Sequence, residues 1–277
     1  MYKRAFNEYA KADDSKIMMF EGTQFPDIVG VMGGIVNPVG FQELPGGNDS
    51  ASTQVLNEHT YCCQMGASVC ATGEPPLSLR SECESFHSRR LDQRQKDAAR
   101  LGVPLMITEF GACFDSDNCA MEIELVTDKA DAVNAGWAYW EFKNYWDFTT
   151  SAGTGSEGFY NMDGSLQDKK IKALSRSYLP YTQGRLTSLK FHADTGDFAA
   201  AFVVDTTIAE PSVLFVSEEF WFKDAKKVIG LTHNGVQLAS EQVEIRNEGV
   251  YYYFQVLDEK LNGETLQVAV TPSKQIA

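Results

Sequence analysis

The stretch Leu105-Met106-Ile107-Thr108-Glu109-Phe110-Gly111-Ala112 decides the fold that this sequence predicts. Its apolar beginning is short enough for a buried strand of a parallel sheet, and Gly111 then allows the chain to turn away. In a (β/α)8 barrel, residues at the carboxyl ends of the strands face the active site. A carboxylate that closes an apolar strand is costly to place unless it is paired or functional. Glu109 is therefore a candidate catalytic residue, and a structural carboxylate is the alternative.

Strands and helices alternate on both sides of this stretch. The candidate strands span residues 17–21, 55–61, 105–109 and 136–141. The candidate helices span residues 2–12, 78–100, 121–134 and 166–178. This alternation predicts βαβ units and a parallel sheet. A complete (β/α)8 barrel needs eight strands and about 250 residues, so four strands predict half of a barrel, with the other half outside this sequence.

The pattern changes after residue 183. Short alternating or apolar strands recur there at intervals of about 8–12 residues, separated by turn signals such as His233-Asn234-Gly235. The candidate strands span residues 186–192, 198–204, 212–216, 250–256 and 266–270. The pattern predicts a small antiparallel β-sandwich. We therefore expect two domains, a partial α/β barrel over residues 1–182 and a β-sandwich over residues 183–277.

Composition and charge exclude several classes of partner. With 43% hydrophobic and 12% aromatic residues the chain can bury a sizeable core. The net charge of −14 argues against binding nucleic acid or anionic membranes, and neutral substrates fit better. The sequence predicts no transmembrane segment, and Met1–Phe6 lacks the apolar region of a signal peptide. Asn48-Asp49-Ser50 is a glycosylation sequon, which is compatible with a secretory route.

Six cysteines are confined to the first 119 residues, at positions 62, 63, 70, 83, 113 and 119. Their even number permits disulfides, but the adjacent pair Cys62-Cys63 makes complete pairing awkward, and the pairing is left open. No pair of C-x-x-C motifs occurs, so we expect no metal site. The sequence also lacks the G-x-S-x-G motif of acyl hydrolases.

Several motifs, in this order and spacing, resemble glycoside hydrolase family five, and more narrowly its endoglycoceramidase-like branch. They are Phe20-Glu21, His59-Thr60-Tyr61-Cys62, Thr108-Glu109-Phe110-Gly111-Ala112, Tyr139-Trp140-Glu141-Phe142-Lys143, the run from Glu157 to Leu166, and the run from Leu174 to Pro180. The resemblance covers most of the chain. It implies that the four strands are strands five to eight of a (β/α)8 barrel.

The resemblance also implies roles for individual residues. Glu109 matches the nucleophile of retaining glycosidases, which use two carboxyl groups about 5–5.5 Å apart. His59 and Tyr61 match residues of the sugar subsite, where the phenol can hydrogen-bond the nucleophile; a buried core pair is the alternative. Trp140 matches the aromatic floor under the sugar, although a bare aromatic there would more often be core.

Three further charged residues are open to two interpretations. Glu141 and Lys143 lie at the rim of the cleft, or they form a mutual or surface ion pair. Glu21 contacts substrate, or forms a buried salt bridge.

One motif of the family is absent from the sequence. The acid/base glutamate of the family lies in an Asn-Glu-Pro motif on strand four. Asn57-Glu58 belongs to the strand-six motif instead, and strand alternation places Glu58 opposite His59 and Tyr61. We do not assign Glu58 as a substitute.

Two functions remain open at this stage. The first is a retaining glycoside hydrolase that acts on glycosylceramide or another glycolipid, without cofactor or metal, and that is completed by a partner half barrel. The second is a catalytically inactive remnant that binds carbohydrate or glycolipid. The resemblance implies a secreted or a lysosomal or vacuolar protein.

Overall fold

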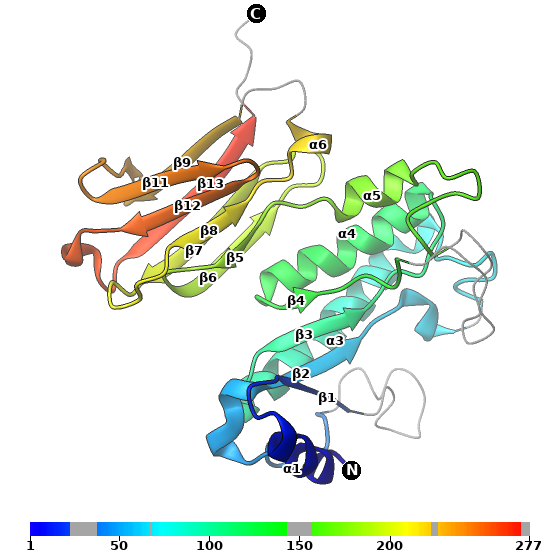
Figure 1. The fold of residues 1–277 in the computed structure, drawn as a ribbon. Coiled ribbons are helices and arrows are strands. Elements are labelled where there is room, and N and C mark those ends of the chain that lie inside the picture. Colours follow the sequence, from blue (N-terminus) through cyan, green and yellow to red (C-terminus); the bar gives the residue numbers. More distant parts are fainter. Residues whose placement is uncertain (23–37, 67, 143–156, 223–226, 273–277) are drawn as a thin grey trace, which may run out of the picture. The chain divides into compact units, whose positions relative to one another are not determined.

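The computed structural model describes residues 1–22, 38–66, 68–142, 157–222 and 227–272 (Figure 1). The chain forms two compact units, Met1–Ile171 and Lys172–Ala277. Within the described ranges, no helix combines the length and the apolar character needed to cross a membrane. Lys143, a predicted substrate-binding residue, lies outside the described residues.

The first unit contains a four-stranded parallel sheet in the order β1-β2-β3-β4, which confirms the predicted parallel α/β arrangement. Its strands are β1 (Met18–Glu21), β2 (Gln54–His59), β3 (Leu105–Glu109) and β4 (Gly136–Trp137). Because all four strands run the same way, their carboxyl ends lie at one edge. At this edge Glu21 is aligned with Asn57, and His59 is aligned with Glu109.

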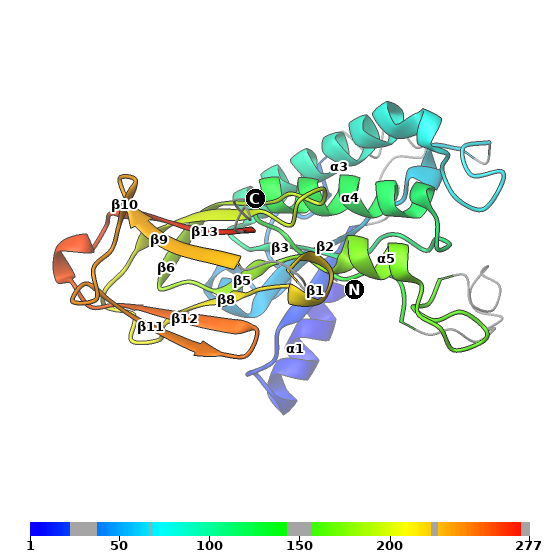
Figure 2. The ribbon, with the colours of Figure 1, turned by 90° about the horizontal axis from the view of Figure 1, so that it is seen from above.

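Two long helices join the strands of this unit. The helical elements are α1 (Tyr2–Ala12), α3 (Arg80–Leu101), α4 (Asp117–Ala132), α5 (Asp168–Leu174) and the short 3-10 helices η1 (Asn48–Thr53), η2 (Cys62–Met65) and η3 (Leu77–Leu79). α3 joins β2 to β3, α4 joins β3 to β4, and the two pack against each other along one face of the sheet (Figures 1 and 2). α3 is followed by Gly102, whose φ of 71° is the left-handed conformation that commonly stops a helix. The Ser116 side chain caps α4 by accepting the N–H of Cys119.

β4 is shorter than predicted: the regular strand covers Gly136–Trp137, whereas the predicted strand covers residues 136–141. Beyond Trp137 the segment continues irregularly: Trp140 N–H donates to Phe110 O at 3.0 Å, and Ala112 N–H donates to Trp140 O at 2.9 Å. Gly111 permits this path because its φ is 98° and because a Cβ there would lie 2.1 Å from the ring of Tyr139. The segment therefore stays beside the end of β3 without forming a regular strand.

All six cysteines are paired in disulfides, as Cys62–Cys83, Cys63–Cys70 and Cys113–Cys119. The expectation that adjacent Cys62 and Cys63 hinder complete pairing is therefore wrong. Both residues lie in η2, and successive side chains of a 3-10 helix point about 120° apart. Cys62 thus reaches α3, whereas Cys63 reaches the following loop.

The second unit contains a five-stranded sheet in the order β10-β9-β13-β7-β6 and a four-stranded sheet in the order β11-β12-β8-β5. All their strand pairs are antiparallel. The elements are β5 (Tyr178–Tyr181), β6 (Gly184–Phe191), β7 (Phe198–Val204), β8 (Ser212–Phe215), α6 (Glu218–Trp221), β9 (Lys227–His233), β10 (Val236–Gln237), β11 (Val243–Glu248), β12 (Tyr251–Val256), η4 (Glu259–Leu261) and β13 (Thr265–Pro272). Both sheets contribute to one apolar core, whose most buried members include Phe198, Phe202, Leu214, Phe254 and Leu266. The predicted antiparallel sheets are thus confirmed.

The last helix predicted for the first domain ends early, at Leu174 rather than at residue 178. Pro180 disfavours helical geometry in the residue before it, and the chain becomes β5, which pairs with β8. Trp221 Nε1 donates to Ser175 O at 2.5 Å, and Ser217 N–H donates to Ser177 Oγ at 3.0 Å. These bonds tie the segment to the second unit, which begins at Lys172, while the predicted domain boundary near residue 183 stays a prediction.

The second unit has a core of its own, so residues 172–277 expressed alone should unfold cooperatively. Phe202 has no exposed surface, and Phe202→Ala should lower the free energy of unfolding by about 3–5 kcal/mol. Urea denaturation followed by the fluorescence of Trp221 measures both effects. A broad, non-cooperative transition of the isolated segment would contradict its autonomy.

Candidate active site

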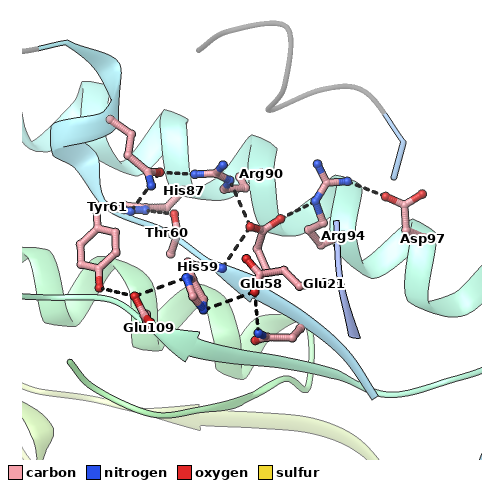
Figure 3. A network of polar contacts seen from close by, with 12 residues as sticks. Glu21, Glu58, His59, Thr60, Tyr61, His87, Arg90, Arg94, Asp97 and Glu109 are labelled. Atoms are coloured by element: carbon pink, nitrogen blue, oxygen red, sulfur yellow. Dashed lines mark hydrogen bonds and ion pairs between the residues drawn. The ribbon is translucent and has the colours of Figure 1, made fainter. Parts of the chain in front are cut away.

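The carboxylate of Glu109 is held by His59, the last residue of β2, and by Tyr61, two residues further along the chain. Tyr61 Oη donates to Glu109 Oε2 at 3.2 Å, and His59 Nδ1 lies 3.3 Å from the same oxygen (Figure 3). The Glu109 side chain remains 29% exposed. Glu109 therefore closes a buried strand, has two fixed partners and still reaches solvent.

His59 connects Glu109 to a second carboxylate. Its other ring nitrogen, Nε2, lies 3.6 Å from Glu21 Oε2 and 3.1 Å from Thr108 Oγ1. Asn57 Nδ2 donates to Glu21 Oε2 at 3.0 Å, and Thr108 Oγ1 donates to Asn57 Oδ1. Glu21 is thus a partly buried member of the Glu109 cluster, with 24% of its side chain exposed.

Burial raises the pKa of two groups in this cluster, Glu21 and Tyr61. It raises the pKa of Glu21, an effect that nearby His59 opposes and that the charges of Glu58 and Glu109 reinforce. Burial and the negative charge of Glu109 raise the pKa of the Tyr61 phenol well above its usual range. Tyr61 therefore keeps its proton at neutral pH and acts as a hydrogen-bond donor to Glu109.

Glu58 lies on the other side of β2, as strand alternation predicts. It is buried against α3, where Arg94 Nε contacts its Oε2 at 2.5 Å (Figure 3). Arg94 also contacts Asp97 at 2.6 Å, and Asp97 Oδ2 accepts the N–H of Val39 at 3.0 Å. Glu58 therefore forms ion pairs with the arginines of α3. Its side chain lies on the side of β2 opposite the His59 and Tyr61 side chains that contact Glu109.

A buried pair behind β2 fixes the segment between His59 and Cys62. His87 contacts Thr60 Oγ1 at 2.8 Å through Nδ1 and Glu122 Oε2 at 3.1 Å through Nε2. Glu122 Oε1 accepts the N–H of Cys62 at 2.8 Å. Among the described residues, Glu122 also lies with Cys62 and Cys83 at metal-ligand spacing, but the two sulfurs are joined in a disulfide and the carboxylate is already hydrogen-bonded.

Trp140 lies half-buried where the irregular segment passes the end of β3. Its Nε1 donates to Glu157 Oε2 at 3.1 Å, and Tyr139 Oη donates to Glu157 O at 3.1 Å. Glu141 follows directly and is also half-buried. The structure therefore holds Trp140 through Glu157, which residue-level reasoning did not select even though it begins one of the motifs quoted above.

A buried lysine anchors the segment that carries Glu157. Lys170 has no exposed surface, and its Nζ donates to Gly158 O at 2.8 Å and to Gln167 Oε1 at 2.5 Å. Burial lowers the pKa of Lys170 to about 8, although neighbouring acids, Asp115 first, oppose this effect. The predicted helix over residues 166–178 gave no signal for such burial, because Lys170 lies between Lys169 and Lys172 and no local pattern distinguishes it from them.

Comparison with known proteins identifies relatives of this chain. Endoglycoceramidase I of Rhodococcus hoagii is 29% identical over 164 residues, which cover 59% of this chain and 29% of that protein. The endoglycoceramidase of Cyanea nozakii is 22% identical over 191 residues, covering 68% of this chain and 34% of that protein. No family model matches the chain. The chain therefore spans about a third of the length of these curated relatives.

Solved structures share its fold. Endo-glycoceramidase II from Rhodococcus sp., in its ganglioside GM3 complex, superposes with a TM-score of 0.68 at 16% identity, covering 98% of this chain and 53% of that chain. Sterylglucosidase 1 of Cryptococcus neoformans superposes with a TM-score of 0.58 at 12% identity over 80% of this chain and 38% of that chain. The resemblance to endoglycoceramidase-like glycoside hydrolases that the motifs indicate is confirmed.

Lys170 should give the free energy of unfolding a specific pH dependence. Its pKa is lower in the folded than in the unfolded chain, so the unfolded chain binds more protons above about pH 8. Folded stability should therefore rise with pH between about 8 and 10.5. In Lys170→Met this rise in the free energy of unfolding, which totals at most about 3 kcal/mol, should vanish.

Urea unfolding at a series of pH values measures this slope. Lys169→Met is the matched control because Lys169 is the exposed neighbour, paired with Asp117 at 2.7 Å. It should keep the rise in stability above pH 8. Equal slopes in wild type and Lys170→Met would show that Lys170 is not held in a site that disfavours its charge.

Proposed function

We propose that this chain supplies the nucleophile side of a retaining glycoside hydrolase that acts on glycosylceramide or another glycolipid. The observation that carries the proposal is the Glu109 carboxylate, held at Oε2 by Tyr61 and by His59 at the carboxyl edge of a parallel sheet. The Tyr61 phenol donates a hydrogen bond to Glu109 and so orients the carboxylate that would attack the sugar. The likeness to endoglycoceramidases supports this choice of substrate class.

We propose further that β1 to β4 correspond to strands five to eight of a (β/α)8 barrel, followed by a C-terminal β-sandwich. The parallel strand order and the superposition on about half of an endo-glycoceramidase II chain support this assignment. The acid/base glutamate would then come from strand four, across the cleft from Glu109. His59, Tyr61, Trp140 and Glu141 would bind the sugar.

In this mechanism an oxygen of Glu109 attacks the anomeric carbon and the bond to the leaving oxygen breaks. The strand-four acid protonates that oxygen, and the sugar remains as an ester on Glu109. The strand-four carboxylate, which has lost its proton, then acts as a base and takes a proton from water. That water cleaves the ester, and the overall reaction retains the anomeric configuration. Tyr61 and His59 hold the carboxylate in place throughout, because both contact it from the fixed end of β2.

The three disulfides support an oxidising compartment as the location of the protein. Disulfides persist in oxidising environments and are rare in the reducing cytosol. We therefore propose a secreted or a lysosomal or vacuolar location, as the resemblance implies.

An activated fluorosugar tests the nucleophile directly. A 2,4-dinitrophenyl 2-deoxy-2-fluoroglycoside of glucose or lactose needs no protonation of its leaving group, so labelling does not depend on the acid/base residue. Peptide mass spectrometry should find the sugar on Glu109, and Glu109→Gln should remain unlabelled. A label on another residue would refute the assignment. Sugar binding without any label would favour the inactive binding protein.

Tyr61→Phe should slow catalysis less than Glu109→Gln. The substitution removes one hydrogen bond to a charged group, worth roughly 1.5–3 kcal/mol, or about one to two decades in kcat. Glu109→Gln removes the nucleophile and should reduce turnover to background. Initial rates with the protein that includes the strand-four carboxylate measure both.

Tyr181→Phe is the matched control for Tyr61→Phe, because Tyr181 is 69% exposed in the second unit. It should leave kcat unchanged. A Glu109→Gln variant more active than Tyr61→Phe would exclude Glu109 as the nucleophile.

A further inference from the structure

Two arginines of α3 lie buried behind the end of β2. Arg90 and Arg94 are one helical turn apart and therefore share a face, with side chains 0% and 1% exposed. Both contact the Glu58 carboxylate, Arg94 at 2.5 Å and Arg90 at 3.7 Å (Figure 3). Such a pair could serve only to neutralise Glu58, but Arg90 has a further contact.

That contact is Gln64, whose Oε1 accepts a hydrogen bond from Arg90 Nη1. The same Oε1 accepts the backbone N–H of Tyr61 at 3.4 Å, and Gln64 N–H donates to Tyr61 O at 3.0 Å. On its other side, Arg90 approaches Glu58 Oε1, which accepts the backbone N–H of His59 at 3.0 Å. Arg90 thus contacts both side-chain oxygens that accept the amides of His59 and Tyr61.

The backbone amides of His59 and Tyr61 need side-chain acceptors because β1 ends before it could pair with these two residues. Thr60 N–H donates to Glu109 O at 3.0 Å, which pairs this segment with β3. Alternate amides of a strand point to opposite sides, so those of His59 and Tyr61 point away from β3. β1 ends at Glu21, which is aligned with Asn57, before it could run beside either residue. Glu58 and Gln64 take the place of a backbone partner.

We propose that Arg90 is a positioning residue for the nucleophile. By fixing Glu58 and Gln64, it fixes the backbone of the two residues whose side chains hold Glu109. The inference rests on the proposed function, since it concerns the orientation of the proposed nucleophile. Arg94 differs from Arg90 because its second partner is Asp97. Asp97 in turn accepts the backbone N–H of Val39, so Arg94 supports a different segment of the chain.

Arg90→Lys tests the proposal. The substitution keeps the charge but replaces the rigid planar fork by a compact ammonium on a flexible stem, which does not reproduce the geometry that reaches both Glu58 and Gln64. Hydrogen exchange of the His59 and Tyr61 amides should accelerate at least about 10-fold. The rate at which the activated fluorosugar labels Glu109 should fall about 10-fold.

Arg100→Lys is the matched control, because Arg100 lies on the same helix, is 42% exposed and contacts Asp97 Oδ1 at 3.5 Å. It should alter neither readout. Gln64→Met removes the acceptor for Tyr61 alone, and should accelerate exchange at Tyr61 but not at His59 while also slowing the labelling of Glu109.

Unchanged exchange at both amides in Arg90→Lys would overturn the proposal. So would exchange that accelerates throughout β3 and α4 in Arg90→Lys while Gln64→Met is labelled at the wild-type rate. A wild-type protein that is never labelled at Glu109 contradicts the proposed function, whereas equal labelling of wild type and Arg90→Lys contradicts only the role of Arg90.

Discussion

The parallel pairing of β2 with β3 is the constraint on which the candidate site depends. The register shifts between Glu58 and His59, so that His59 is aligned with Glu109 at the edge of the sheet. Thr60 then continues the pairing through its bond to Glu109 O, and Tyr61 is carried past the end of β3. Without this alignment, the imidazole and the phenol would not converge on one carboxylate oxygen.

Opposite faces of β2 divide the charges of this region. Glu58 is buried against arginines, where removal of one partner would leave a charge without compensation, a loss of about 3–5 kcal/mol. Glu109, on the side of His59 and Tyr61, contacts a phenol and an imidazole and stays partly exposed. The two glutamates lie on neighbouring strands, yet Glu58 is buried in an ion pair whereas Glu109 is hydrogen-bonded and partly exposed.

The sequence was informative wherever local pattern and packing agree. The run Leu105–Glu109 is apolar, short and bounded by Pro104 and Gly111, and it forms β3 over the predicted residues. Alternation along β2 also placed Glu58 opposite His59 and Tyr61. In both cases the residues within the element contain the information.

Other features depend on distant parts of the chain and left no local signal. The 136–141 segment is aromatic throughout, but its irregular path follows from the close contact between Gly111 and Tyr139. β5 is tied to α6 by Trp221 and Ser217, some 40 residues away in sequence. The pairing of Cys62 and Cys63 follows from the turn of η2, and the burial of Lys170 from its contacts with Gly158 and Gln167. The sequence therefore indicated candidate residues at the edge of the sheet, but not the distant contacts that hold them in place.

Because Cys62 and Cys63 are adjacent, the geometry of the candidate site depends on each forming its correct disulfide during folding. Tyr61 precedes Cys62, and Gln64 follows Cys63. An isomer in which Cys63 instead of Cys62 bonded Cys83 would rotate η2 by one residue, carrying Tyr61 and Gln64 away from their partners. Such a molecule would contain the same number of disulfides and much of the same core. Its yield would be governed by thiol–disulfide exchange during synthesis, and a titration of free thiols would not distinguish it from the native protein.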